Sequence, residues 1–215
     1  MSAWSAKDSV PLPLPPAPDR IHSVNTRLLA LVPTCIALNV AMGKIVQELG
    51  LPIYLDAVGT ILVTTLLGPM AGMLTGCLSQ ALTALLSGQM MWLAFLPIQV
   101  LIVLVAAAAA GRAGFRTIFR AIGWGALCGL LGGTLSSVIS YSLFKGVTAP
   151  GVTALGALFR SLGFPLERAV TAASISTDLV DKGIAFGLVA TVLLALPTRM
   201  ARRFPTAVGA TGRQA

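Results

Sequence analysis

A long stretch without any charged side chain limits what this chain can fold into. From Ala57 to Gly111 there is no Asp, Glu, Lys, Arg or His, which makes 55 consecutive residues. In a water-soluble domain the outer faces of such a stretch would meet water, whereas a bilayer favours it. Of the 215 residues, 56% are hydrophobic and 10% are charged, and the mean hydropathy is +0.88. The sequence therefore predicts an all-α integral membrane protein.

The uncharged stretch has to hold parts of several spans. At ~1.5 Å per residue, a single helix through it would be about 80 Å long, far more than the thickness of a bilayer. Gly68–Pro69 is expected to stop one span, and Ser87–Gly88 is expected to stop the next. The apolar segments predict a single six-helix bundle with spans at about residues 26–48, 53–67, 70–87, 92–111, 118–144 and 167–197.

Two polar ends flank the predicted membrane domain, which covers residues 25–200. Residues 1–24 are polar and rich in proline, a composition that favours an extended, disordered arm. The arm lacks the basic-then-apolar layout of a cleavable signal peptide, so the first span is expected to stay in the protein. Residues 201–215 are expected to form a cytoplasmic C-terminal tail.

The basic residues predict how the spans are oriented. With six spans, one side of the membrane carries eight arginines and the other side carries four basic residues. The two groups are Arg20, Arg27, Arg112, Arg116, Arg120, Arg199, Arg202 and Arg203 on the first side, and Lys44, Lys145, Arg160 and Arg168 on the second. Because Lys and Arg gather in cytoplasmic loops, both termini are expected in the cytoplasm.

Several function classes find no support in the sequence. The basic residues behind the formal charge of +8 lie near the ends of the predicted spans and are not interleaved with aromatic residues. Nucleic-acid binding is therefore not predicted. There is no Ser/His pair, no zinc-protease motif, no dinucleotide-binding loop and no Walker lysine loop, so we predict neither an enzyme nor a cofactor. The three cysteines lie singly in apolar segments and the chain has one histidine, which argues against a metal site.

Charged residues inside the spans are the strongest candidates for a binding site, because burying them is costly. Asp56 heads the uncharged stretch, and it is expected about one turn inside the outer end of the second span, close to Tyr54. Asp178, Asp181 and Lys182 have spacings that place them on one face of the sixth span. They either neutralise one another as a structural group or line a solute cavity. Their expected depth, similar to that of Asp56, favours an outward-facing cavity shared by the two helices.

Other residues near the expected outer side are weaker candidates for contacts with a solute. Gln99 and Tyr141 could contact the solute, although a hydrogen bond between helices is the commoner role of such groups. Trp92 belongs either to the interfacial belt of aromatic side chains or to the cavity. The Gly- and Pro-rich connection at 145–166 is equally well explained as a lid and as a passive loop.

Two patterns of small residues predict close helix packing. Gly125, Gly129 and Gly133 recur every four residues in the fifth span, where internal packing against another helix is expected. Ala37 and Ala41 have the same spacing in the first span, and internal packing is the default explanation there as well.

Four features together carry a resemblance to a known family. They are the six spans with both termini inside, the Ala37-x-x-x-Ala41 pattern, the segment from Leu51-Pro52-Ile53-Tyr54-Leu55-Asp56 through Gly59-Thr60 and Leu67-Gly68-Pro69 to Gly72 and Gly76, and Asp178-x-x-Asp181-Lys182. In these features the chain resembles the substrate-binding S components of energy-coupling factor (ECF) vitamin transporters. The resemblance covers about residues 26–200.

The resemblance implies a mechanism and a set of partners. An S component of the bacterial cytoplasmic (inner) membrane binds a vitamin or a vitamin precursor on the outer side and docks on a coupling transmembrane subunit. It then topples in the membrane to release the solute, driven by two ATP-binding subunits. Ala37 and Ala41 would then belong to the docking surface. The solute-binding residues would come from Tyr54, Asp56, Trp92, Gln99, Tyr141, Asp178 and Asp181.

Two other functions stay open from the sequence. The chain could be a stand-alone, gradient-driven transporter in which the three aspartates carry protons or sodium ions, or a structural or sensor subunit without a solute. For an S component, flavin-like, corrinoid-like and other vitamin-precursor solutes rank above transition-metal ions, which would need more His, Cys or clustered carboxylate ligands.

Overall fold

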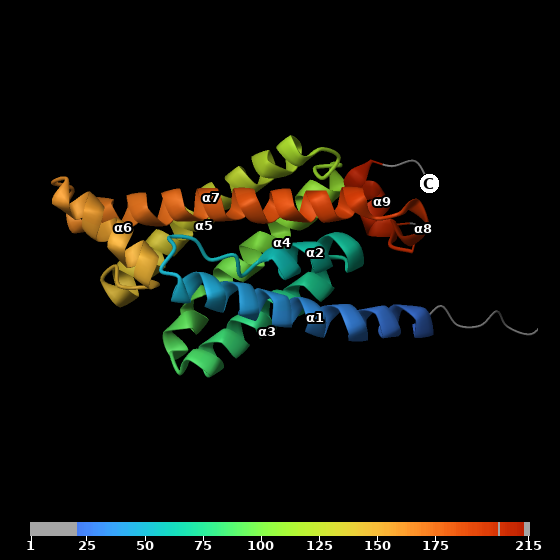
Figure 1. Cartoon of the computed structure of the whole chain (residues 1–215), viewed down its shortest axis with the longest axis horizontal. Coiled ribbons are helices and arrows are strands. Elements are labelled where there is room, and N and C mark those ends of the chain that lie inside the picture. The colour runs from blue at the N-terminus through green and yellow to red at the C-terminus, as the bar shows by residue number, and fades with distance from the viewer. Residues whose placement is uncertain (1–20, 202, 213–215) are drawn as a thin grey trace, which may run out of the picture.

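The structure, a computed structural model, describes residues 21–201 and 203–212 (Figure 1). These residues form helices and contain no strand, which confirms the predicted all-α fold. The elements are α1 (Ile21–Glu48), α2 (Val58–Leu67), α3 (Pro69–Ser87), the 3-10 helix η1 (Met90–Phe95), α4 (Leu96–Gly111), α5 (Ile118–Phe144), α6 (Pro150–Ser161), α7 (Leu166–Ala195), α8 (Thr198–Ala201) and α9 (Pro205–Thr211).

Among the described helices, four segments are long and apolar enough to cross a membrane. They are Ala30–Glu48, Pro69–Ser87, Met90–Gly111 and Ile118–Phe144. The ten residues of α2 are apolar but short, and α7 is long but has charged residues in its middle. The helices therefore have the composition of a multi-pass membrane protein.

The turn between α2 and α3 lies where the sequence places it. Gly68 ends α2 with a φ of 96°, a backbone conformation that favours glycine, and Pro69 opens α3 at a position where its missing N–H costs nothing. The prediction that Gly68–Pro69 stops the second span is confirmed.

The start of the second span differs from the sequence prediction. Residues 53–57 are not helical, and α2 begins only at Val58. Asp56, expected one turn inside the span, lies in the loop that precedes it. The physical reason is a long-range contact: Asp181 on α7 accepts hydrogen bonds from the backbone N–H groups of Tyr54 and Leu55, which holds this segment away from a helical path.

The two ends of the chain also differ from the expectation. Residues 21–24, expected in the disordered arm, belong to α1, and residues 1–20 lie outside the described part. In the expected tail, α9 packs back on the bundle. Its Ala207 and Ala210 are buried, and the backbone N–H of Phe115 donates to the Ala210 carbonyl. The connection at 145–166 contains α6, which packs on α7.

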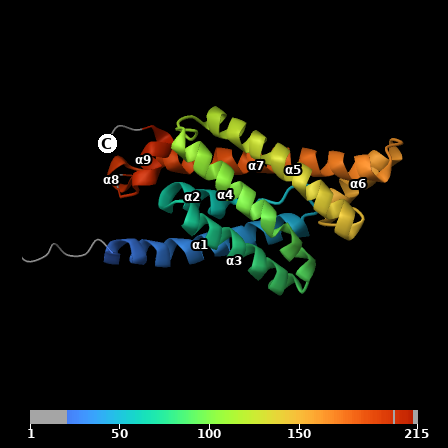
Figure 2. The ribbon, with the colours of Figure 1, turned by 180° about the vertical axis from the view of Figure 1, so that it is seen from behind.

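The α5–α7 pair is the most extensive helix contact of the bundle, and it follows the glycine pattern. A Cβ atom added to Gly129 would lie 2.6 Å from the Leu179 Cα atom, and one added to Gly133 would lie 2.6 Å from the Ile175 Cα atom. At Gly125 the added atom would lie 2.9 Å from the Gly183 Cα atom. The three glycines therefore let the two backbones touch, which confirms the expected internal packing. Figure 2 shows α5 running along α7.

A buried asparagine joins the first three helices. Asn39 on α1 accepts a hydrogen bond from the Gly59 N–H at 2.7 Å, and its amide donates to the Thr60 hydroxyl at 2.9 Å and to the Ser79 hydroxyl at 3.1 Å. These bonds use both ends of the amide, so the polar group is satisfied in an apolar interior. They fix α2 against α1 and α3 directly after the loop that carries Asp56.

The helix ends sort into two groups along the long axis of the molecule. The first turns of α1, the α4–α5 connection, α8 and α9 lie at one end, at the right of Figure 1. The C-terminal end of α1, the α3–η1 turn and α6 lie at the opposite end. Figure 2 shows the same division from behind.

Candidate binding cavity

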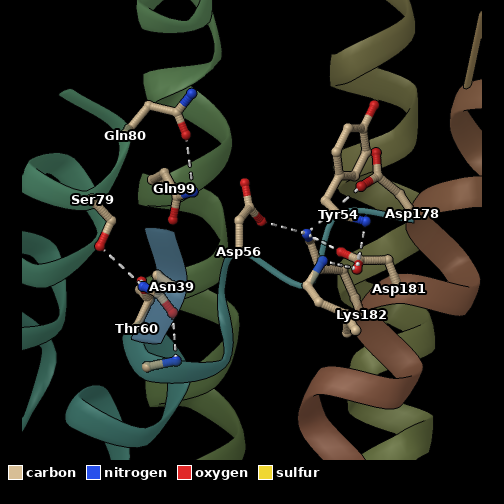
Figure 3. A network of polar contacts seen from close by, with 12 residues as sticks. Asn39, Tyr54, Asp56, Thr60, Ser79, Gln80, Gln99, Asp178, Asp181 and Lys182 are labelled. Carbon is tan, nitrogen blue, oxygen red and sulfur yellow. Dashed lines mark hydrogen bonds and ion pairs between the residues drawn. The ribbon is translucent and has the colours of Figure 1, made fainter. Parts of the chain in front are cut away.

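The charged residues of α7 and of the α1–α2 loop meet in one cluster around Lys182 (Figure 3). The Lys182 ammonium lies 2.5 Å from a carboxylate oxygen of Asp181, 3.7 Å from Asp56 Oδ1 and 3.8 Å from Asp178 Oδ1. Lys182 and Asp178 are each 2% exposed and Asp181 is fully buried, whereas the Asp56 side chain is 32% exposed. One cation therefore neutralises three carboxylates only in part.

Asp181 is the anchor of this cluster. Its Oδ1 accepts the Leu55 N–H at 2.6 Å and the Tyr54 N–H at 3.1 Å, and its Oδ2 contacts Lys182. Leu55 has a φ of 50°, a conformation that a leucine adopts only when its surroundings impose it. The carboxylate of α7 thus shapes the loop, and the loop in turn places Tyr54 and Asp56.

A cavity opens beside the cluster. Its interior has a volume of about 30 Å³, and the empty space reaches about 380 Å³ only when the open solvent at its mouth is included. Its walls come from the α1–α2 loop, α3, η1, α4, α5 and α7. The polar lining residues are Tyr54, Asp56, Gln80, Gln99, Ser136, Asp178 and Lys182. The apolar lining residues are Trp92, Phe95, Ile98 and Ile102. Polar residues outnumber apolar ones in the lining, so several polar groups converge beside an apolar, partly aromatic wall.

Two glutamines form a hydrogen-bonded chain along one wall of the cavity. The Gln80 amide N–H donates to the Trp92 carbonyl at 2.6 Å, and the Gln99 amide N–H donates to the Gln80 side-chain oxygen at 3.2 Å. Three buried polar atoms of the lining find no hydrogen-bond partner within the described part of the protein. They are Gln99 Oε1, Asp178 Oδ2 and Trp92 Nε1. Buried polar groups are normally paired with protein, ordered water or a ligand, so these three atoms are available to a bound molecule.

Most of the residues expected to bind a solute are brought together. Tyr54, Asp56, Trp92, Gln99 and Asp178 all line the cavity. Asp181 lies behind the lining and holds the loop. Tyr141 does not line the cavity and is 38% exposed on α5.

The sequence left other lining residues outside the predicted site. These include Gln80, Ser136 and Lys182, although Lys182 was expected on the same helix face as Asp178. Phe95, Ile98 and Ile102 had no individual signal. Their spacing from Trp92 and Gln99 is nevertheless helical, so one face through η1 and α4 could have been singled out.

The two alanines of the first span are not packed inside the part of the bundle that the structure describes. Ala37 and Ala41 are both exposed on α1, although Asn39 between them is buried. The default expectation of internal packing is therefore wrong for them, because this face of α1 turns away from α2 and α3.

Neither a metal-binding group among the described residues nor a known relative identifies the function of the cavity. Across residues 21–201 and 203–212, no group of His, Cys, Asp and Glu side chains is arranged to hold a metal ion. The chain matches no protein-family model, no curated protein and no solved structure.

Proposed function

We propose that the protein is the substrate-binding S component of an ECF-type transporter in a bacterial cytoplasmic membrane. In this role it binds a vitamin or vitamin precursor from outside and delivers it with a coupling transmembrane subunit and two ATP-binding subunits. The observation that carries the proposal is the cavity, in which the loop before α2 and the charged turn of α7 are held together by Asp181. The same two segments carry the family resemblance in the sequence.

The proposed topology has six spans, namely α1, α2, α3, η1 with α4, α5 and α7. The arrangement of the helix ends supports it. Arg112 and Arg116 belong to the α4–α5 connection, Arg120 to the first turn of α5 and Arg199 to α8, all at the end of the bundle where α1 starts. Lys44, Lys145, Arg160 and Arg168 belong to segments at the other end. Together with Arg20, Arg27, Arg202 and Arg203, the sequence has eight basic residues on the first side against four on the second, which favours the cytoplasm for the first side, and the proposal has the cavity open to the outside.

Gentle extraction followed by native mass spectrometry tests whether the cavity holds a solute. We expect a small molecule bound in a one-to-one ratio, and we expect Asp56→Asn to weaken its retention by roughly tenfold, because a charged hydrogen-bond acceptor at the mouth is lost. Glu48→Gln, which neutralises an exposed carboxylate on α1, is the matched control and leaves retention unchanged. Purified protein without any bound molecule would count against the proposal.

The exposed alanines of α1 give the proposed docking surface a separate test. Ala41→Trp fills this surface with a bulky ring, so we expect ATP-dependent uptake in cells to fall at least about tenfold while solute retention stays unchanged. Val138→Trp places the same ring on an exposed position of α5 and serves as the control. Loss of retention together with uptake in Ala41→Trp would show that Ala41 supports the cavity and is not a docking residue.

A gradient-driven transporter is the second candidate, favoured by the cluster of Asp56 with the buried Asp178, Asp181 and Lys182. Proteoliposomes that contain only this chain separate the two functions. Solute uptake driven by a proton or sodium gradient, without ATP-binding partners, would replace the S-component proposal by this one.

A further inference from the structure

We propose that the cavity selects a planar aromatic cation with N–H donors, such as a protonated amidine or an amino-substituted nitrogen heterocycle. The inference rests on the proposed function, because it names the chemical class of the solute at the same site. It follows from which polar atoms around the cavity already have a hydrogen-bond or ion-pair partner in the protein and which do not.

The positive charge of Lys182 is already paired with carboxylates of the protein itself. Lys182 has three N–H donors, and its ammonium has three carboxylates around it, at 2.5, 3.7 and 3.8 Å. The same ammonium lies 5.8 Å from the centre of the Tyr54 ring, over its face. A negatively charged solute would have to take Lys182 away from buried carboxylates, which would leave these without a counter-charge.

The carboxylates around Lys182 are not fully neutralised by it. Both oxygens of Asp181 are occupied, one by two backbone N–H groups and one by Lys182. Asp178 Oδ2 is buried without a partner in the described structure, and the Asp56 carboxylate, 32% exposed, lies 3.7 Å from Lys182. With all three carboxylates ionised, the cluster would carry a formal excess of two negative charges beside the cavity. A bound cation would neutralise part of this excess.

The glutamine chain supplies a further acceptor, and its direction is fixed. The Trp92 backbone carbonyl can only accept, so Gln80 must turn its NH₂ group toward it and its oxygen toward Gln99. Gln99 must then donate its own NH₂ group to Gln80. The Gln99 side-chain oxygen is therefore left over as an acceptor in the lining. With Asp178 Oδ2 it makes two buried acceptors that call for N–H donors on the solute.

The lining also contains a buried N–H donor without a partner, and part of its wall is aromatic. Among the fully buried lining atoms of the described residues, Trp92 Nε1 is the donor without a partner, which fits an acceptor such as a ring nitrogen. The Tyr54 and Ser136 hydroxyls also line the cavity, and each can donate or accept. Trp92 and Phe95 lie with ring centres 5.9 Å apart, and Tyr54 also lines the cavity. Aromatic faces attract flat rings and cations alike. The lining thus combines two buried acceptors without partners, the Trp92 N–H donor and an aromatic surface.

Three probes of nearly the same shape test the inference, namely benzamidine, benzamide and benzoate, which are positive, neutral and negative at pH 7. Binding to the full-length protein, dialysed to remove retained molecules, is measured by calorimetry in detergent. We expect benzamidine to bind at least about tenfold more tightly than benzamide, and benzoate not to bind. Asp178→Asn should remove the preference for benzamidine. Glu167→Gln, an exposed carboxylate on the same helix, should keep it.

Each other outcome overturns the inference. Equal or tighter binding of benzamide or benzoate shows that the cavity does not select a cation, and an Asp178→Asn protein that keeps the preference shows that the acceptors are misassigned. If Asp178→Asn does not fold, Asp56→Asn replaces it, and an undiminished preference there has the same meaning. If none of the three probes binds, the aromatic cation is ruled out. The proposed function is decided separately by native mass spectrometry, where a retained anionic molecule would uphold it and refute the inference.

Discussion

Replacing Lys182 with methionine is expected to lower the free energy of unfolding by roughly 3–5 kcal/mol, because it removes the one cation of a buried cluster and leaves the carboxylates uncompensated. Lys182 is 2% exposed and contacts Asp56, Asp178 and Asp181, so little solvent can take over its role. The methionine side chain fills a similar volume, and a cavity therefore contributes little to the loss. Unfolding in detergent, driven by heat or by SDS, measures the effect.

Two further variants separate the charge effect from packing. Lys44→Met makes the same replacement at an exposed position of α1 and is expected to change stability by less than about 0.5 kcal/mol. In Lys182→Met combined with Asp181→Asn, one of the uncompensated charges is also removed. The double variant should therefore lose less stability than the two single variants together. Strict additivity would mean that the two side chains do not form a charge pair.

Gly129→Ala is expected to lower the free energy of unfolding by about 3 kcal/mol, the upper end of the usual range for overpacking. The added methyl group would lie 2.6 Å from the Leu179 Cα atom and 2.7 Å from the Asp178 carbonyl carbon. Backbone atoms cannot turn away as side chains do, so α7 has to move off α5. Since Asp178 lines the cavity, solute retention should fall as well.

Gly132→Ala is the matched control on the same helix. The nearest atoms to its added methyl group are side-chain carbons of Ile98 and Leu101, at 3.9 and 4.0 Å. In a helix, alanine is favoured over glycine by about 1 kcal/mol, so this variant should be neutral or slightly more stable. Equal effects of the two substitutions would contradict the close α5–α7 contact. Thermal unfolding of both proteins under the same conditions makes the comparison.

The sequence predicted the helices well where local signals mark their ends. Gly68–Pro69 separates α2 from α3, and α5 covers the predicted residues 118–144, because glycine and proline act within a few residues of the turn. The loop at 53–57 was missed, because it is held by Asp181, 126 residues away from Leu55. Hydrogen bonds over such a separation leave no pattern in the local sequence. α6 did have a local signal, Pro150 at its start, and could have been predicted.

The sequence predicts the part of the site that depends on helical spacing within a single helix. The spacings of Asp178, Asp181 and Lys182 placed them on one face of α7, and the structure puts all three in one cluster. The rotation of α5 could not be derived in the same way. Its glycine face turns toward α7, which brings Ser136 to the cavity and leaves Tyr141 outside it. Only the contact between the two helices decides which α5 residues face inward.

The bond between the α1–α2 loop and Asp181 also has a consequence for how the protein is made. The ribosome adds Asp181 126 residues after Leu55, which at the usual 5–20 residues per second takes ~6–25 s. During this time the first helices are already synthesised, and the Asn39 network is available to hold them together. The loop receives its anchor only when α7 arrives. Translation of the last long helix is therefore the step that completes the cavity, and a nascent chain released before Lys182 would leave Asp56 without its counter-charge.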